Sequence, residues 1–345
     1  MNISTMALLS APRQTVMQAQ AALSQAQIEL ASGRLADIGT GLGRTTGEYV
    51  ALGAQQTRLQ SIKDSNAGTA TRLAATTAGL DTLRGTASSF LSLLTEASTA
   101  GATPGALVAT GTSNLDALTA TLNTSVGGQA IFAGINTGLV PLTTYAAGSA
   151  AKAAVDNVFS STFGTSQSSA SVSSISGPAM QSFLDGSYAA LFNASGYAAR
   201  WSTASDQVTT AQISSTETVV TSVSANAQPF RQLAQAYAMV KEFGGANFGS
   251  AAGQAVIASA TTLVSSALAG MTSAEAGIGQ SQSALSDAND RMTTQIGYLS
   301  TQASDLVSVD AAALSTRISG LQTQIQASYE MTAQLQQLSL VNYLK

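Results

Sequence analysis

Residues 52–94 read LGAQQTRLQSIKDSNAGTATRLAATTAGLDTLRGTASSFLSLL. A seven-residue spacing runs through this stretch and defines one face of a helix, formed by Leu52, Leu59, Asn66, Leu73, Leu80, Ala87 and Leu94. A companion row, three residues further along, holds Ile62, Leu83 and Phe90. Such a repeat is typical of a coiled coil. We therefore predict one long helix over about 45–98.

A second repeat of the same period lies near the C-terminus, at Leu285, Met292, Leu299 and Leu306. It predicts another long helix over about 272–308, which bends or breaks between residues 304 and 310. An isolated helix of this kind is barely stable, because ordering each residue costs about 1–2 kcal/mol and each buried Leu contributes only about 1.5–3 kcal/mol. We expect the two rows to cover each other as an intrachain antiparallel coiled-coil core.

The two chain ends carry similar stripes with less bulk. In the first predicted helix, which we expect to end at Ser32 and Gly33, the stripe consists of Val16, Leu23 and Leu30. In the last helix it consists of Ile318, Leu321, Ile325, Leu335, Leu338, Leu340 and Val341. We interpret these residues as an assembly interface. Residues 1–34 and 311–345 are expected to stay loosely ordered until other subunits cover them.

The middle of the chain differs in composition from both ends. All five prolines lie from Pro12 to Pro229, so most of both ends is free to form long helices. Residues 134–225 are rich in Ser, Thr and Gly, and 207–213 and 218–223 suit strands joined by a turn at 214–217. We expect the single tryptophan, Trp201, in the core of this part.

Together these patterns predict a mainly α protein. A long antiparallel coiled-coil helical bundle comes from both chain ends, and a smaller α+β domain with strands lies in the middle. The expected divisions are an N-terminal helical assembly segment at 1–44, the N-terminal part of the helical core at 45–133, a variable middle domain at 134–226, the C-terminal part of the core at 227–308, and a C-terminal helical assembly segment at 309–345.

The composition excludes several classes of function. Charged residues make up only 9% of the 345 residues, the net charge is −4, and the chain has neither Cys nor His. Disulfides, thiolate zinc sites and Ser/His/Asp triads are therefore impossible, and a nucleic-acid partner is not expected because it would need clustered Lys and Arg. We expect no catalytic or metal site, no cofactor, no cleaved signal peptide and no membrane insertion.

Three local features need a separate interpretation. The glycines of GTGLG, residues 39–43, have the wrong spacing for a dinucleotide fingerprint, so we interpret them as a flexible connection between helices. Asp287, Asp290 and Glu330 are interpreted as solvated helix faces rather than acid–base groups. Asn66 occupies a Leu position of the stripe: it either fixes register and partner number or is a solvated defect near a helix end.

Several motifs together show a family resemblance. They are IST at 3–5, LASGR at 30–34 closing the first helix, and LQQLSLVNYL at 335–344. With helical ends, a polar middle and no Cys or His, the chain resembles the flagellin and hook-associated protein 3 superfamily of the bacterial flagellum. GQAIFAGINT at 128–137, followed by Pro141 and Leu142, resembles hook-associated protein 3, particularly its alphaproteobacterial form. Residues 34–49 and 88–94 depart from the usual filament flagellin pattern.

The resemblance implies a structural subunit that joins hook to filament. It implies export through the flagellar secretion apparatus, a ring of copies at the hook tip, and contacts with hook-associated protein 1, with flagellin and with an export chaperone. The alternative within the superfamily is a filament flagellin that polymerises into the filament itself. A coiled-coil adhesin or sensor-like rod is a further alternative, and an enzyme is the least favoured.

Overall fold

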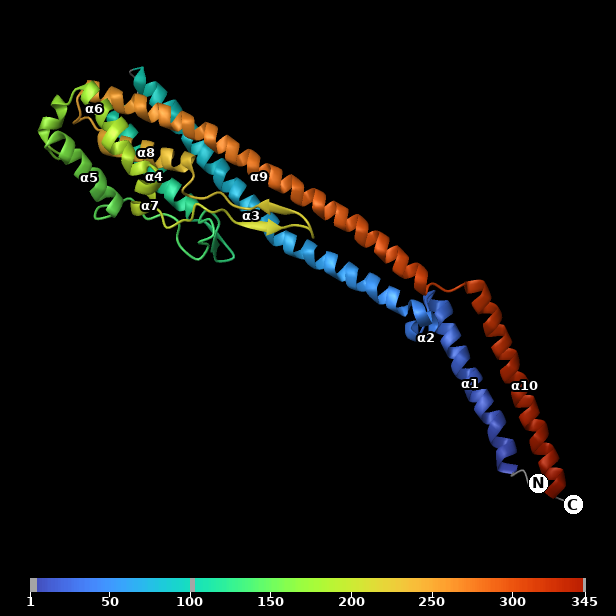
Figure 1. Cartoon of the computed structure of the whole chain (residues 1–345). Coiled ribbons are helices and arrows are strands. Elements are labelled where there is room, and N and C mark those ends of the chain that lie inside the picture. Colours follow the sequence, from blue (N-terminus) through green and yellow to red (C-terminus); the bar gives the residue numbers. More distant parts are fainter. Residues whose placement is uncertain (1–4, 100–102, 344–345) are drawn as a thin grey trace. The chain divides into compact units, whose positions relative to one another are not determined.

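The computed structural model describes the backbone of residues 5–99 and 103–343 and the side chains of 13–99 and 103–334. The chain divides into two compact units (Figure 1). Unit 1 comprises residues 1–61 and 291–345, and unit 2 comprises residues 62–290. Two long helices, α3 (Thr46–Ser98) and α9 (Ser250–Val307), each contribute residues to both units.

Unit 1 is built from helices. It contains α1 (Thr5–Ser32), the short α2 (Ile38–Leu42), the first part of α3, the last part of α9, and α10 (Ala311–Tyr343). Helix α1 ends where predicted, because Gly33 takes the left-handed conformation (φ 68°) that stops a helix. The predicted break near residues 304–310 is also confirmed, since α9 ends at Val307 and α10 begins at Ala311. The glycine-rich segment at 39–43, predicted to be a flexible connection, does lie between two longer helices, but it is itself helical, because residues 39–42 belong to α2.

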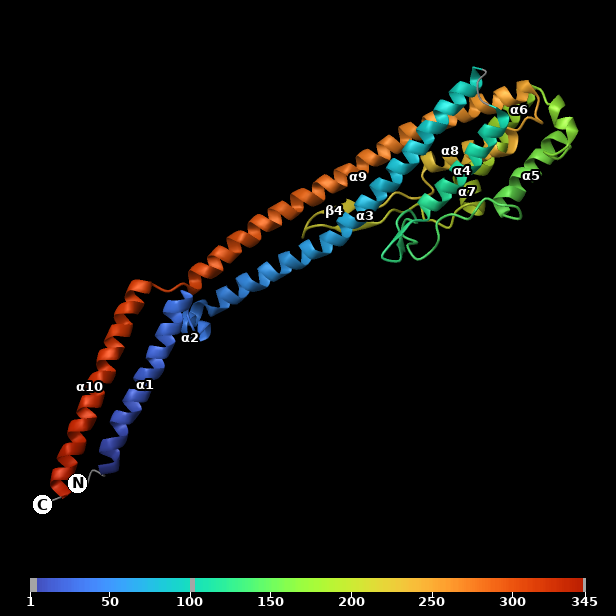
Figure 2. The same ribbon diagram turned by 180° about the vertical axis from the view of Figure 1, so that it is seen from behind.

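In unit 2, α3 and α9 run side by side in opposite directions (Figures 1 and 2). Arg84 Nε lies 3.0 Å from Glu275 Oε1, and Gln282 Nε2 donates to Thr77 Oγ1 at 3.2 Å. These pairs show the antiparallel register directly, which confirms the prediction of an intrachain antiparallel arrangement for this part of the chain. The predicted core residues Leu73, Leu80, Ala87, Leu94 and Leu285 are all buried here.

The remaining predicted core residues lie in unit 1 and are covered less evenly. Met292 and Leu299 are buried, with 4% and 5% of their surface exposed. Leu52, Leu59 and Leu306 are half-buried.

Two further helices fill the interior of unit 2. Helix α4 (Pro104–Leu122) packs against α8 (Gln228–Phe243), and α8 is buried on most of its surface. Close approach depends on Gly111, because a Cβ at this position would lie 3.3 Å from the carbonyl oxygen of Tyr237. Tyr237 in turn meets Phe90 of α3 edge to face, with ring centroids 5.1 Å apart. The side chains of α8 thus join α4 to α3.

Aromatic side chains hold the middle segment onto this interior. Helices α5 (Ala150–Phe163) and α6 (Gly177–Phe183) bring Phe159 and Phe183 against Phe243 of α8, with ring centroids 5.4 and 5.5 Å from the Phe243 ring. After α7 (Ala194–Arg200), Trp201 stacks on Tyr145 and Tyr197 and is 1% exposed. The prediction of a core tryptophan in the middle segment is therefore confirmed.

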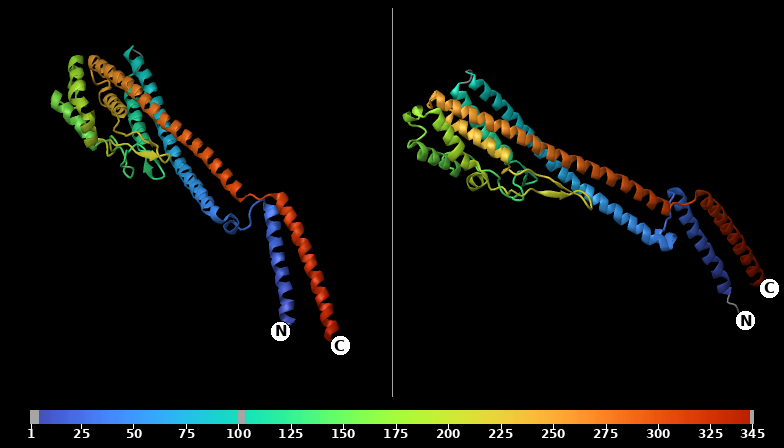
Figure 3. Two further views of the ribbon diagram at one scale, coloured as in Figure 1. Left: turned by 45° about the vertical axis from the view of Figure 1, so that its right-hand side comes forward. Right: turned by 45° about the horizontal axis from the view of Figure 1, so that its top comes forward.

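The strands are few and short. β1 (Ser125–Val126) pairs with β2 (Gln129–Ala130), and β3 (Thr210–Gln212) pairs with β4 (Thr218–Val220), both antiparallel. The second hairpin lies in the predicted place, and its turn is closed by the Ile213 N–H, which donates to the Glu217 carbonyl oxygen at 2.9 Å. The mainly α fold with a small strand-containing middle region is therefore confirmed (Figure 3). This middle region and the helices around it belong to one compact unit.

Helix α9 contains a strongly apolar stretch, although we expect no membrane insertion from the sequence. An 18-residue window of it reaches a mean hydropathy of 1.5, so by length and composition this one described helix could cross a membrane. A core helix meets the same criterion. In unit 2 a buried face of α9 contains Val256, Ala260 and Val264, and one third of the window is buried.

Asn66 lies fully buried inside unit 2 rather than at a solvated helix end. Its Nδ2 donates to the carbonyl oxygen of Ile213 at 2.9 Å and to Oδ1 of Asn289 at 2.8 Å. One amide thus ties α3 both to α9 and to the turn end of the β3–β4 hairpin. Of the two alternatives for this residue, the geometry favours the one that fixes register, because no other alignment of the helices brings these groups together.

Substituting Asn66→Leu should destabilise unit 2 although it completes the leucine stripe. The buried carbonyl oxygen of Ile213 would lose the donor that Asn66 supplies, which costs about 1–3 kcal/mol, and Asn289 would lose one hydrogen bond. Urea unfolding followed by Trp201 fluorescence measures the change. As a control, Gln55→Leu on an exposed position of the same helix should shift the free energy of unfolding by less than about 0.5 kcal/mol. A leucine variant as stable as the parent chain would contradict this role for Asn66.

Candidate assembly surface

The two chain ends form a pair of helices within unit 1. Helices α1 and α10 lie side by side and run antiparallel (Figures 1 and 2). Gln20 Nε2 of α1 donates to the Tyr329 hydroxyl of α10 at 2.9 Å. Val16, Ala19 and Ala26 of α1 and Leu314 of α10 are buried. Small alanines along α1 allow a second helix to approach closely.

A short backbone bridge fixes where this pair begins. The Leu35 N–H donates to the Val307 carbonyl oxygen at 2.9 Å, and the Val309 N–H donates to the Gly33 carbonyl oxygen at 3.2 Å. Arg34 and Ser308 form the antiparallel bridge between them. The end of α1 and the start of α10 are thereby held together by main-chain hydrogen bonds that any side chains would permit.

Three carboxylates accept hydrogen bonds from backbone N–H groups near this bridge. Glu29 is 6% exposed, and its Oε1 accepts from the Ala36 N–H at 3.2 Å. Asp310 Oδ1 caps α10 by accepting from the N–H groups of Ala312 and Ala313. Asp37 caps α2, and hydrogen bonds from the Thr40 side chain and backbone lower the pKa of its carboxyl. These acidic groups stabilise the connections between the helices.

The structure places the predicted stripe residues at different depths. Val16 is 9% exposed, Leu23, Ile318, Leu321 and Ile325 are half-buried, and Leu30 is 40% exposed. The side chains of Leu335, Leu338, Leu340 and Val341 lie outside the described residues. Within the described residues both ends are helical, from Thr5 to Ser32 and from Ala311 to Tyr343. Helices α1 and α10 supply part of each other's cover, and the expectation that the ends stay loosely ordered until other subunits complete this cover stays a prediction.

A further set of apolar side chains in unit 1 faces solvent, and only one of its members, Leu30, belongs to a predicted stripe. It consists of Met17, Ile28, Leu30, Val50, Tyr298, Tyr329 and Met331, which are 40–64% exposed. All but Leu30 fall outside the predicted stripes, so a search for one seven-residue row misses them. The available signal was that α1 and α10 carry apolar residues on more than one face, which is typical of a helix that is covered on several sides.

Few charges interrupt this surface. Arg13 and Glu29 are the charged residues of α1, and Arg317 and Glu330 are those of α10. Glu29 is buried and accepts from the Ala36 N–H, while Arg317 and Glu330 are exposed. Burying such helices against another protein therefore removes few charges from water, and the desolvation cost stays low.

The acidic residues considered for chemistry lie apart from any site. Asp287 and Asp290 of α9 and Glu330 of α10 are exposed, as a solvated helix face requires. Among the side chains that the structure describes, no three acidic groups gather as metal ligands would.

Fold and surface together define a structural helical protein whose paired ends present apolar side chains for association. Residues 3–137 match the bacterial flagellin N-terminal helical region, and residues 261–344 match the bacterial flagellin C-terminal helical region. The two matches cover more than half of the chain, which belongs to the flagellin superfamily. Proteins of this family are structural and non-enzymatic, and they self-assemble into flagellar polymers as exported components of the flagellum.

A solved structure has the same fold. It is described as a flagellar hook-associated protein from Vibrio parahaemolyticus, with a TM-score of 0.52 and 12% sequence identity. The alignment covers 76% of the present chain and 97% of that chain. Comparison with curated proteins finds no match.

Replacing Met17, Ile28 and Met331 by Ser should weaken self-assembly without unfolding the chain. Each side chain is more than half exposed in the single chain, so the free energy of unfolding should change little. Loss of even one buried apolar contact of about 1.5–3 kcal/mol lowers an association constant about tenfold. Sedimentation velocity measures association, and circular dichroism measures helix content.

The matched control replaces three exposed glutamines of the same helices, Gln18, Gln27 and Gln326, by Ser. It carries the same loss of helix propensity and side-chain length but removes no apolar contact. Equal assembly by the two triple variants would show that the exposed apolar side chains of unit 1 do not form the assembly surface.

Proposed function

We propose that this protein is the hook–filament junction protein of a bacterial flagellum, most similar to alphaproteobacterial hook-associated protein 3. It joins hook to filament through coupled folding and self-assembly of its terminal helices. The observation that carries the proposal is the pair α1 and α10, whose apolar side chains are covered only in part within one chain. Two helices with a half-covered stripe are marginally stable, so a partner that completes the cover also consolidates the helices.

The segment at 128–137, which resembles hook-associated protein 3, supports the choice within the superfamily. Ile131, Phe132 and Ala133 are fully buried, and the Phe132 carbonyl oxygen accepts from the Ala225 N–H at 2.7 Å. Gly134 has φ 61°, and a Cβ there would lie 2.4 Å from the carbonyl oxygens of Ser205 and Gln207. The motif therefore packs inside unit 2, and residue 134 must be glycine because any side chain there would clash with these carbonyl oxygens.

The proposal assigns a role to each segment predicted from the sequence. Segments 1–44 and 309–345 form the assembly interface, with Val16, Leu23, Leu30, Ile318, Leu321, Ile325, Leu335, Leu338, Leu340 and Val341 as its stripe. Segments 45–133 and 227–308 form the helical core, and 134–226 is the variable middle domain. Copies of the chain form a ring at the hook tip, with hook-associated protein 1 below and flagellin above.

Export precedes assembly in this scheme. The chain leaves the cell through the flagellar secretion apparatus without a cleaved signal peptide, bound beforehand by an export chaperone, and functions outside the cell. The absence of Cys suits this route, since the unfolded chain cannot cross-link on its way.

Cells that lack the protein should build hooks but fail to retain filaments. The full chain should restore attached filaments, whereas a chain truncated to residues 35–308 should not, because it lacks both terminal helices. Electron microscopy of cells and of the medium measures attached and released filaments. Secretion of the truncated chain is checked by immunoblot, and a chain fused to a heterologous export signal serves if the native one is lost. Restoration by an exported truncated chain would contradict the proposal.

A filament flagellin is the second candidate, and the two flagellin matches at both ends favour it. Polymerisation separates the two functions. A filament subunit, purified and concentrated alone, grows into long fibres visible by electron microscopy, whereas a junction protein stops at short or ring-like assemblies.

A further inference from the structure

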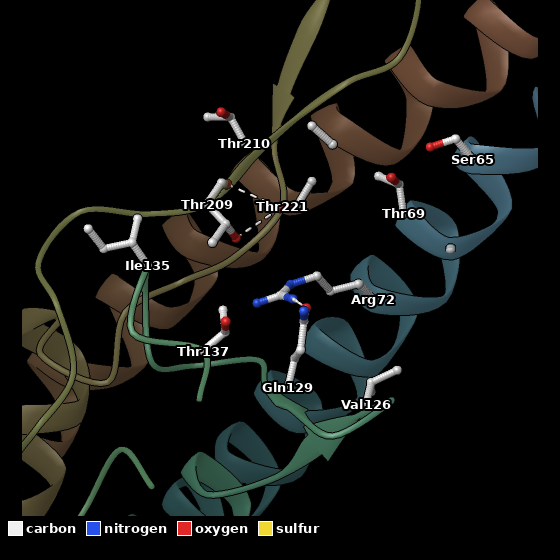
Figure 4. A pocket seen from close by; sticks show the side chains of 12 residues that line it. Ser65, Thr69, Arg72, Val126, Gln129, Ile135, Thr137, Thr209, Thr210 and Thr221 are labelled. Carbon is white, nitrogen blue, oxygen red and sulfur yellow. Dashed lines mark hydrogen bonds between the residues drawn. The ribbon is translucent and has the colours of Figure 1, made fainter. Parts of the chain in front are cut away.

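A pocket of about 640 Å³ lies within unit 2, apart from the terminal helices. Three elements line it: α3, the segment at 126–137, and the β3–β4 hairpin (Figure 4). Most of the lining is neutral and hydroxyl-rich, including Ser65, Thr69, Thr137, Thr209, Thr210 and Thr221. Thr209 and Thr221 are joined across the hairpin by hydrogen bonds, so that side of the pocket is well fixed.

Arg72 of α3 supplies the one charge of this lining. Its guanidinium extends between the hairpin and the 126–137 segment (Figure 4). Nη1 donates to Gln129 Oε1 and Nη2 donates to the Ala130 carbonyl oxygen, both at 3.2 Å. Both acceptors are neutral, and no acidic partner of Arg72 occurs among the described residues.

The Nε atom of Arg72 is buried and makes no hydrogen bond within the described part of the chain. Burial also lowers the pKa of this guanidinium, as expected for a cation without a compensating charge. Each Nη nitrogen keeps one further hydrogen, and the positive charge has no compensating carboxylate within the described part of the chain. A group that supplied both an acceptor and a negative charge would complete this site.

Some exposed apolar side chains lie beside the pocket. The exposed large apolar residues that the structure describes in unit 2 are Ile135, Leu139, Val140, Val208 and Val220, 38–66% exposed. Ile135 lines the pocket, and Val208 and Val220 directly adjoin the lining residues Thr209 and Thr221, so these three form its apolar rim. An arginine beside exposed apolar side chains is typical of protein–protein interfaces, where neighbouring contacts exclude water from the charge.

We infer that this pocket receives the carboxylate of an Asp or Glu side chain from a second copy of the chain. One carboxylate neutralises one guanidinium and can accept from the Nη hydrogens that Gln129 and Ala130 do not use, while lining hydroxyls such as those of Thr69 and Thr137 donate to its remaining lone pairs. The chain has 18 acidic against 14 basic residues, so its copies supply such side chains. The inference rests on the self-assembly proposed above but concerns a different surface.

A cross-linking experiment tests the occupant while Arg72 stays intact. Because the chain has no Cys, Thr210→Cys creates a unique thiol at the pocket for a benzophenone label. After assembly of the full chain and irradiation, mass spectrometry should find the label joined to a peptide of another copy that contains Asp or Glu. The same label at Gln55→Cys, an exposed position of α3 in unit 1, is the control and should give a different peptide.

Charge substitutions then test the chemistry. Arg72→Gln should lower the association constant about tenfold and reduce its dependence on salt, with Arg72→Lys intermediate. Urea unfolding of each variant separates an assembly defect from a folding defect. Arg72→Glu combined with replacement of the cross-linked acid by Arg should restore association even where the single variants fail.

The outcomes separate this inference from the proposed function. Restored filaments together with unchanged association of Arg72→Gln, or with cross-links only to peptides lacking acids, would overturn the inference and leave the junction role intact. Cross-links between acidic peptides and Thr210→Cys, in a chain that fails to restore filaments, would support the inference and contradict the junction role. Binding of glutarate to the dilute monomer, lost in Arg72→Gln, without intersubunit cross-links would assign the pocket to a free carboxylate instead.

Discussion

Burial of the apolar stripes on long helices is the constraint on which the rest of this structure depends. With so few charged side chains in the sequence, salt bridges contribute to few of the helix contacts. The Arg84 pairs are partly exposed and contribute little, whereas Lys152 of α5 and Glu242 of α8 form a more buried pair at 3.2 Å. In unit 2 the stripes of α3 and α9 are covered by each other and by α4 and α8. In unit 1, α1 and α10 cover each other only in part. Helices with covered stripes are suited to a stable body, and helices with partly covered stripes are suited to association.

The few buried polar side chains define how the apolar surfaces meet. Asn66 connects two helices and a hairpin through a single amide, and Glu29 holds the connection that follows α1. Apolar packing alone tolerates a sliding register, whereas a buried amide or carboxylate is satisfied in one arrangement only. Arg72 differs in its charge, because its guanidinium donates only to the neutral oxygens of Gln129 and Ala130. The buried amide and carboxylate thus help to specify the fold, and Arg72 is the charged group for which we infer a contact outside the chain.

In the proposed function the chain leaves the cell unfolded and then self-assembles. A composition rich in Ala, Ser and Thr and without Cys suits the first step, since it forms no covalent cross-links. Durable contacts between copies require area that can be removed from water, and the exposed apolar residues of unit 1 and of the pocket rim in unit 2 provide it. Two separate surfaces on one chain allow contacts in more than one direction, which a closed ring or tube needs.

The amino-acid sequence by itself determined the long helices, the end of α1, the break between α9 and α10, the β3–β4 hairpin and the family, because period, glycine stops and proline placement act locally. It placed the start of the second long helix at about 272, whereas α9 begins at Ser250. It also identified Asn66 as unusual but could not choose its role, since the choice depends on Ile213 and Asn289, far away in the chain. Only the tertiary structure showed that α1 and α10 cover each other, that Met17, Ile28 and Met331 remain exposed, and that Arg72 lies in a pocket without an acid. Each of these depends on which surfaces meet, and a one-dimensional repeat carries no information about which neighbour covers it.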